Sequence, residues 1–157
     1  MRIGALNDGR ATTALLPPDQ WGNYRSTTSS VESDTVTYRF DTPVRVDGAG
    51  IAFHRDSNWI RPPASWRIDH LAADGTWQPV ATTGAYPNST TAWNEVSFEP
   101  VTTLALRATF NGQASGAYFN SVSVSEWEVD AVAPTATSGP PSRPAPARPR
   151  CCQAPSG

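Results

Sequence analysis

Apolar and polar residues alternate along most of this chain from Thr35 onward, and this pattern constrains the fold more than any other feature. In the run that follows, the side chains of Val36, Tyr38 and Phe40 fall on one face of an extended segment, and their neighbours fall on the other. Nowhere do apolar residues recur at helical spacing for long enough to predict a helix. The chain is therefore expected to be all-β, with antiparallel strands.

Turn residues separate the alternating runs. Two segments are expected to interrupt the strands, namely Asp41-Thr42-Pro43 and Asp47-Gly48-Ala49-Gly50. A hairpin is predicted at Asp74-Gly75, because glycine adopts the positive φ of a tight turn. In a later run, the side chains expected to face the core are Leu104, Leu106, Ala108 and Phe110. Most of the tryptophans are also expected in the core, namely Trp66, Trp77 and Trp127. Roughly seven or eight short strands joined by polar turns predict an antiparallel β-sandwich of the jelly-roll type.

The composition changes near Pro134. Proline, alanine and arginine dominate the remaining residues, which offer no apolar pattern to bury and include the only two cysteines, Cys151 and Cys152. We therefore expect one folded β-sandwich domain over residues 1–132 and a disordered tail over residues 133–157.

Charge and hydropathy argue against several classes of partner. The net charge is −2 and the tail contains three arginines but no acid, so the body is acidic and a poor binder of nucleic acid. No stretch approaches the roughly 18 apolar residues of a membrane span, and the N-terminus lacks the apolar region of a signal peptide. We expect a monomer that binds neither nucleic acid nor membranes.

The sequence contains no motif of a known catalytic or phosphate-binding site. A glycosidase needs two convergent carboxylates in a cleft, and Glu126 and Glu128 qualify only by their proximity in the sequence. The chain is therefore not expected to be an enzyme.

One polar loop between strands has the composition of a sugar-binding site. Aromatic rings pack on the apolar face of a sugar while polar neighbours bond its hydroxyls. The loop provides His54, Arg55, Trp59 and Arg61, and the weaker candidates in other loops are Trp21, Tyr24, Asn111 and Tyr118. The alternative is that Trp59 folds back on the core as a lid while the arginines stay solvated.

Glu126 conflicts with the pattern of the last strand. It shares strand parity with Val122 and Val124, so either its carboxylate points inward or a bulge shifts the register before Trp127. A buried carboxylate must be paired or bind a cation. Asn7 and Asp8 could provide oxygen ligands for calcium. Alternatively, Asp8 caps a turn and Glu126 pairs with an arginine.

The order of several short motifs resembles that of the discoidin-like, or coagulation factor V/VIII type C-like, galactose-binding jelly rolls. The motifs are Leu6-Asn7-Asp8-Gly9, Trp21-Gly22, the segments 38–44 and 63–68, Asp74-Gly75-Thr76-Trp77, the segment 94–98, Leu106-Arg107 and Ser125-Glu126-Trp127-Glu128-Val129. They cover about residues 4 to 131 and are most similar to the copies appended to secreted bacterial glycoside hydrolases of the β-L-arabinofuranosidase type.

The resemblance implies a non-catalytic, extracellular module that binds a glycan or polysaccharide through loops at one end and accompanies a glycoside hydrolase catalytic domain. It also implies a structural calcium ion, with Asp8 and Glu126 matching the family's acidic ligands. Two rival interpretations remain: a structural or interaction module that packs on a catalytic partner without binding glycan, and a small β-sandwich hydrolase or lyase.

Overall fold

The computed structural model describes residues 7, 9, 20–25, 31–56 and 58–132. These residues form strands and connecting loops, and none of the described segments is a helix that could span a membrane. The strands are β1 (Trp21–Gly22), β2 (Ser33–His54), β3 (Ser65–Leu71), β4 (Trp77–Pro79), β5 (Asn94–Asn111), β6 (Ala114–Ser115), β7 (Tyr118–Phe119) and β8 (Ser123–Ala131). The predicted tail lies outside the described residues, so its disorder remains a prediction.

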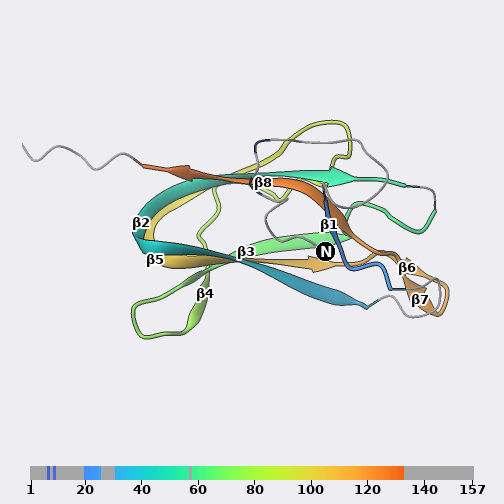
Figure 1. Ribbon diagram of the computed structural model, residues 1–157, viewed down its shortest axis with the longest axis horizontal. Helices are drawn as coiled ribbons and strands as arrows, with labels where there is room; N and C mark the ends of the chain where they lie inside the picture. Colours follow the sequence, from blue (N-terminus) through green and yellow to red (C-terminus); the bar gives the residue numbers. More distant parts are fainter. Residues whose placement is uncertain (1–6, 8, 10–19, 26–30, 57, 133–157) are drawn as a thin grey trace, which may run out of the picture.

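Two long strands build both layers of the sandwich. The sheet has the order β1-β8-β2-β5-β3-β4, and β2 and β5 bend together from one layer into the other (Figure 1). The first half of β2 pairs with the second half of β5, which also pairs with β3. The second half of β2 lies between the first half of β5 and β8. The predicted antiparallel β-sandwich is thus confirmed.

The core lies between the two layers and is rich in aromatic rings. Trp66 and Trp127 are buried in it, and Tyr38 and Phe40 pack against it from the alternating run in β2. Phe53 meets Trp66 and Phe110 edge to face, with ring centroids 5.6 and 5.9 Å apart. The alternation therefore predicted the inward face of this part of β2 correctly.

The predictions of two strand interruptions are wrong. β2 is continuous through residues 41–43 and 47–50, where the structure has register shifts instead of turns. Gly48 and Gly50 leave room for side chains of neighbouring segments, because an added Cβ would stand 2.5 Å from Asp130 Oδ2 and 3.1 Å from Trp93 Cε3. Leu104 is also exposed instead of facing the core, because the pairing of β5 is irregular where the strand bends.

The predicted Asp74-Gly75 hairpin is confirmed. Leu71 pairs with Trp77, and Gly75 has a φ of 83°. The Asp74 carboxylate accepts hydrogen bonds from the hydroxyl and the backbone N–H of Thr76, and these bonds lower the pKa of Asp74.

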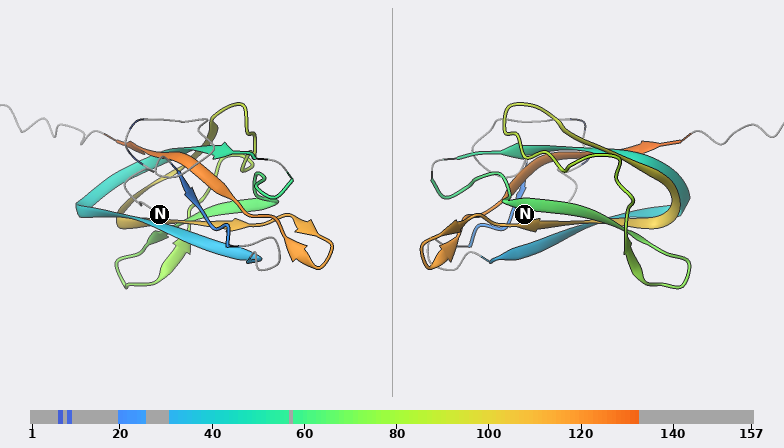
Figure 2. Two further views of the ribbon diagram at one scale, coloured as in Figure 1. Left: turned by 45° about the vertical axis from the view of Figure 1, so that its right-hand side comes forward. Right: turned by 180° about the vertical axis from the view of Figure 1, so that it is seen from behind.

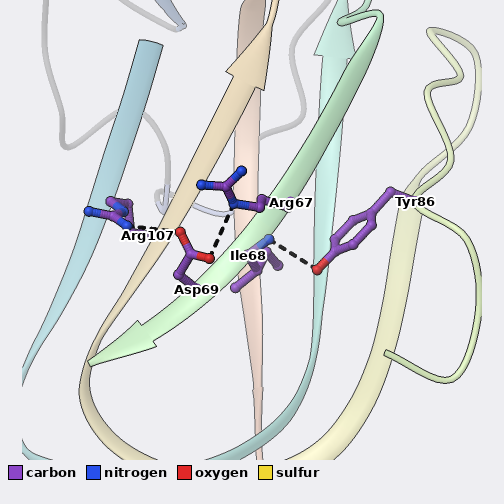
Figure 3. Close-up of polar contacts among 5 residues, drawn as sticks. All are labelled: Arg67, Ile68, Asp69, Tyr86 and Arg107. Atoms are coloured by element: carbon purple, nitrogen blue, oxygen red, sulfur yellow. Dashed lines mark hydrogen bonds and ion pairs between the residues drawn. The ribbon is translucent and has the colours of Figure 1, made fainter. Parts of the chain in front are cut away.

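Polar contacts fasten β3 to its neighbours (Figure 3). The buried carboxylate of Asp69 accepts from Arg107 Nη2 at 2.9 Å and from Arg67 Nε at 3.3 Å. On the other side of β3, the Tyr86 hydroxyl accepts from the Ile68 backbone N–H at 3.0 Å. Burial raises the pKa of Tyr86, because the ionised phenol would lose its contact with water.

Candidate functional site

Three segments meet at the end of the sandwich opposite the bends of β2 and β5. They are residues 20–25, the loop after β2, and the segment from the β6–β7 hairpin into β8; the last two lie at the same end in both views of Figure 2. Ser121 links the last two, because its N–H donates to the Trp59 carbonyl at 2.9 Å and its carbonyl accepts from the Arg61 N–H at 2.9 Å. The Asn23 N–H joins the first segment to the third by donating to the Val122 carbonyl at 3.2 Å. We call this region the loop end.

The amide of Asn120 supports the loop that carries Trp59. It is buried, and its Nδ2 donates to the Asn58 carbonyl at 2.7 Å. Gln113 makes a similar bond to the Pro62 carbonyl at 3.0 Å. Asn120 and Gln113 were not predicted as site residues, because a single asparagine or glutamine in a loop carries no sequence signal. Their bonds fix the backbone on both sides of the exposed Trp59 ring.

Exposed aromatic rings are the main chemical feature of the loop end. Trp59, Tyr24 and Tyr118 are 45%, 48% and 43% exposed. Each comes from a different one of the three segments that meet here. Because Trp59 is nearly half exposed, the alternative that it closes the core as a lid is not supported. Exposed rings of this kind can stack on sugar rings.

The predicted polar residues of this loop differ in accessibility. Arg55 is exposed, and Arg61 is partly buried with its Nη2 donating to Asn58 Oδ1 at 3.1 Å. His54 is buried where it pairs with Ser123 of β8. Its Nε2 and the Nδ2 of nearby Asn23 have no hydrogen-bond partner within the described part of the chain. A ligand could meet the exposed guanidinium directly, whereas His54 sits below the surface.

Two weaker candidates lie in the structural framework. Trp21 is buried in the core and packs on Phe110 with ring centroids 5.7 Å apart, so it offers no exposed face to a sugar. Asn111 ends β5, where its Nδ2 donates to Ser65 Oγ at 2.9 Å. The alternation could not reveal the burial of Trp21, since β1 has only two residues.

A bulge resolves the conflict at Glu126. Phe53 pairs with Val124, but Ala52 pairs with Glu126, so Ser125 is an extra residue in β8. The bulge turns Trp127 into the core, and the carboxylate shares the outer face of the layer with Ala52. Glu126 is nevertheless only 1% exposed, and its Oε1 lies 3.4 Å from the backbone N–H of Gly9.

Of the three residues predicted as calcium ligands, Asn7 and Glu126 fall within the described part of the chain. Asn7, Gly9 and Glu126 line a hollow of about 320 Å³, and Asn7 Nδ2 donates to the Tyr38 hydroxyl, which leaves its Oδ1 as a possible ligand. Carboxylate and amide oxygens are the ligands that calcium prefers. Asp8 lies outside the described residues, and the described residues contain no cluster of three acidic, histidine or cysteine side chains suited to a metal.

The fold is shared with known carbohydrate-binding modules. No protein-family model matches the chain. A structure from the Streptococcus pneumoniae β-galactosidase BgaA superposes with a TM-score of 0.66 and 18% identity, covering 82% of this chain and 84% of that one. This chain has a discoidin-like fold. The resemblance expected from the motifs is thereby confirmed at the level of the fold.

Two further discoidin-like structures agree. The family 32 carbohydrate-binding module of Streptococcus pneumoniae EndoD has a TM-score of 0.58 and 16% identity, with 82% of this chain and 84% of that one covered. The family 32 module of Clostridium perfringens NanJ, determined in complex with galactose, has a TM-score of 0.57 and 18% identity, with 78% and 79% covered. At these identities the similarity establishes the fold, and the ligand must be argued from this chain's residues.

Proposed function

We propose that this chain is a non-catalytic carbohydrate-binding module that acts outside the cell as an accessory to a glycoside hydrolase. The observation that carries the proposal is the set of three exposed aromatic rings at the loop end, Trp59, Tyr24 and Tyr118. Their exposed faces are available to pack on the apolar faces of sugar rings. The discoidin-like fold, which this chain shares with galactose-binding and other glycan-binding modules, supports the same function.

Trp59 is the proposed platform for a sugar ring. Its indole is exposed, while hydrogen bonds from Ser121 and Asn120 hold the backbone of Trp59 and Asn58. A ligand therefore meets a ring on a fixed backbone, which reduces the entropy lost on binding. Arg55 and Arg61 provide donors for sugar hydroxyls at the edge of this platform.

Replacing Trp59 with alanine is expected to weaken binding to the cognate polysaccharide about tenfold, because the stacking surface is lost. A glycan array that includes galactan, arabinan and polygalacturonate identifies the polymer, and affinity electrophoresis in a gel containing it measures retention. The matched control is Leu104→Ala, since Leu104 is equally exposed at 45% and lies on β5, outside the loop end. It should leave binding to this polymer unchanged.

The outcomes of this experiment separate the rival interpretations. If the Trp59→Ala variant unfolds, Trp59 belongs to the core and the proposed platform is wrong. If it folds and binds as before, the glycan lies elsewhere. If the parent protein binds no glycan on the array, the interaction module without a glycan replaces the proposal. Hydrolysis of an array glycan would instead support the small hydrolase.

We further propose that Glu126, Asn7 and Asp8 contribute to a calcium site that fastens the N-terminal segment to β8. A ligand that binds only the folded state raises stability by mass action. Chelator is therefore expected to lower the melting temperature, and calcium in the millimolar range should restore it while magnesium does not.

Glu126→Gln is expected to remove this calcium response, because the amide lacks the negative charge. Glu99→Gln is the matched control, because Glu99 is an exposed acid of β5 that lies outside this hollow. It should keep the response. A melting temperature of the parent protein that is the same in chelator and in calcium would contradict the site.

A further inference from the structure

A second exposed tryptophan lies on the outer face of the sandwich, away from the loop end. Trp93 precedes β5 and is 40% exposed. Its indole lies over Gly50 in the middle of β2, where a Cβ would stand 3.1 Å from Cε3 of the ring. Any larger residue at position 50 would push the indole away from the strand. The glycine thus lets an aromatic ring lie against the sheet.

Acidic side chains surround this ring because of the strand register. Gly50 pairs with Glu95 of β5 on one side and with Glu128 of β8 on the other, so both carboxylates project from the same face as Gly50. The Asp130 side chain lies over Gly48 in the same way, since a Cβ at Gly48 would stand 2.5 Å from Asp130 Oδ2. Two glycines on one strand therefore accommodate a ring and a carboxylate.

These residues line one hollow. It has a volume of about 210 Å³, and its lining consists of Gly50, Trp93, Glu95, Glu128 and Asp130. None of the lining side chains is basic, and none of the ion pairs in the described part of the chain involves its acids. We call it the Trp93 hollow. Three carboxylates with no cation among them favour a positively charged occupant.

Hydrogen bonds of the Asn94 side chain fix the loop that carries Trp93. Asn94 is fully buried, its Nδ2 donates to the carbonyls of Ile51 and Ser89 at 2.9 and 2.8 Å, and its Oδ1 accepts from the Ser89 N–H at 2.6 Å. The position of the residue next to Trp93 is therefore determined by the β2 backbone. The ring and the carboxylates are held on adjacent strands of one sheet, as a preformed site requires.

We propose that the Trp93 hollow binds a protonated amino sugar, as found in a deacetylated glycan. The sugar ring would cover the exposed indole with its C–H face, and the ammonium group would lie among Glu95, Glu128 and Asp130. The volume is below the 300 to 1,000 Å³ typical of drug-sized sites, which suits a single ring. A lysine side chain matches the charge but has no flat face to cover the indole.

This site is separate from the loop end, so its existence does not depend on the proposed function. The two surfaces differ in charge: Arg55 and Arg61 accompany Trp59, whereas carboxylates accompany Trp93. A chain with both sites could hold two different sugars of a mixed polymer. An arginine-rich peptide is the main rival occupant, and the chain's own segment 142–150 has such a sequence.

Calorimetric titration of the full chain with a glucosamine tetramer and with its fully N-acetylated counterpart tests the proposal. The two ligands share the ring and differ in the charge of the amine. The glucosamine tetramer is expected to bind and the acetylated tetramer is not. Trp93→Ala should weaken binding about tenfold, and Glu95→Gln with Glu128→Gln about fivefold. Leu104→Ala, at an exposed residue of β5 outside both surfaces, should leave it unchanged.

Each contrary result has a definite meaning. No binding of the glucosamine tetramer in the millimolar range overturns the proposal, as does equal binding of the acetylated tetramer or full affinity after Trp93→Ala. A peptide with the sequence of residues 142–150 that binds more tightly and displaces the sugar would identify a peptide site instead. The polysaccharide of the loop end and the glucosamine tetramer are measured in separate experiments, so failure of the amino-sugar site and failure of the proposed function are separately visible.

Discussion

A variant with Trp66 replaced by alanine is expected to lose about 3–5 kcal/mol of its free energy of unfolding, a large share of the roughly 5–15 kcal/mol that a domain has. Trp66 is 3% exposed and contacts Phe53 and Tyr86 edge to face, with ring centroids 5.6 and 4.8 Å apart. Its Nε1 also donates to the Pro87 carbonyl, which ties the core to the loop after β4. Alanine would remove all these contacts and leave a cavity.

Urea unfolding followed by circular dichroism measures the loss. Trp66→Phe should cost less than Trp66→Ala, because it keeps a ring in the core and removes only the N–H and part of the volume. Trp77→Ala is the matched control: its half-buried ring lies under the Arg107 guanidinium, 4.5 Å from ring centroid to Cζ, and its loss should cost about 1 kcal/mol. Equal losses for Trp66→Ala and Trp77→Ala would contradict the arrangement of the core.

The same two residues show where the sequence pattern is informative. Trp66 lies in a run of clear alternation and was predicted as core, and the structure confirms it. Trp77 was also expected in the core, but Arg107 lies over its ring on the outside of the sheet. Strand parity cannot decide such a case in a strand of three residues, because the pairing partner determines which face is inward.

Glycine and bulges account for the larger errors in the predicted strands. Asp47-Gly48-Ala49-Gly50 has the composition of a turn, yet the glycines belong to a continuous strand and make room for Asp130 and Trp93. The reason lies in β8 and in the segment before β5, far away in the sequence. By contrast, the parity of Glu126 did predict either an inward carboxylate or a bulge, and the structure shows the bulge.

The sequence indicated the exposed tryptophan of the loop end, but not the exposed tryptophan on the outer face of the sandwich. Trp59 stood out because it interrupts no alternating run and lies among polar residues, and its exposure agrees with that interpretation. Trp93 has no comparable signal, since the carboxylates beside it come from β5 and β8. Only the register places Glu95 and Glu128 on either side of Gly50. Local composition can therefore suggest the loop end, but not a site built across strands.

Asn94→Asp is expected to destabilise the protein by about 3 kcal/mol or more near neutral pH, although the two side chains have the same shape. Asn94 is fully buried, and its Nδ2 donates to the carbonyls of Ile51 and Ser89. A carboxylate oxygen in this position would face those carbonyl oxygens without a hydrogen atom between them. It would keep only the bond that Oδ1 accepts from the Ser89 N–H.

The pH dependence of this variant separates lost hydrogen bonds from buried charge. Burial and the facing carbonyls raise the pKa of the new carboxyl in the folded state above its unfolded value of about 3.9. The folded state then binds the proton more tightly than the unfolded state. The loss of unfolding free energy relative to the parent protein is therefore smallest below about pH 3.9, and it grows as the pH rises through the raised pKa. Asn94→Ala, which has no charge, should show a deficit that is independent of pH.

Urea unfolding of the parent and both variants at several pH values provides the comparison. Asn88→Asp is the matched control, because Asn88 lies in the same loop, is exposed, and donates a single bond to the Pro63 carbonyl. It should cost about 1 kcal/mol at most. Parallel pH profiles for Asn94→Asp and Asn94→Ala would show that residue 94 is solvated, and that the loop carrying Trp93 is held by other contacts.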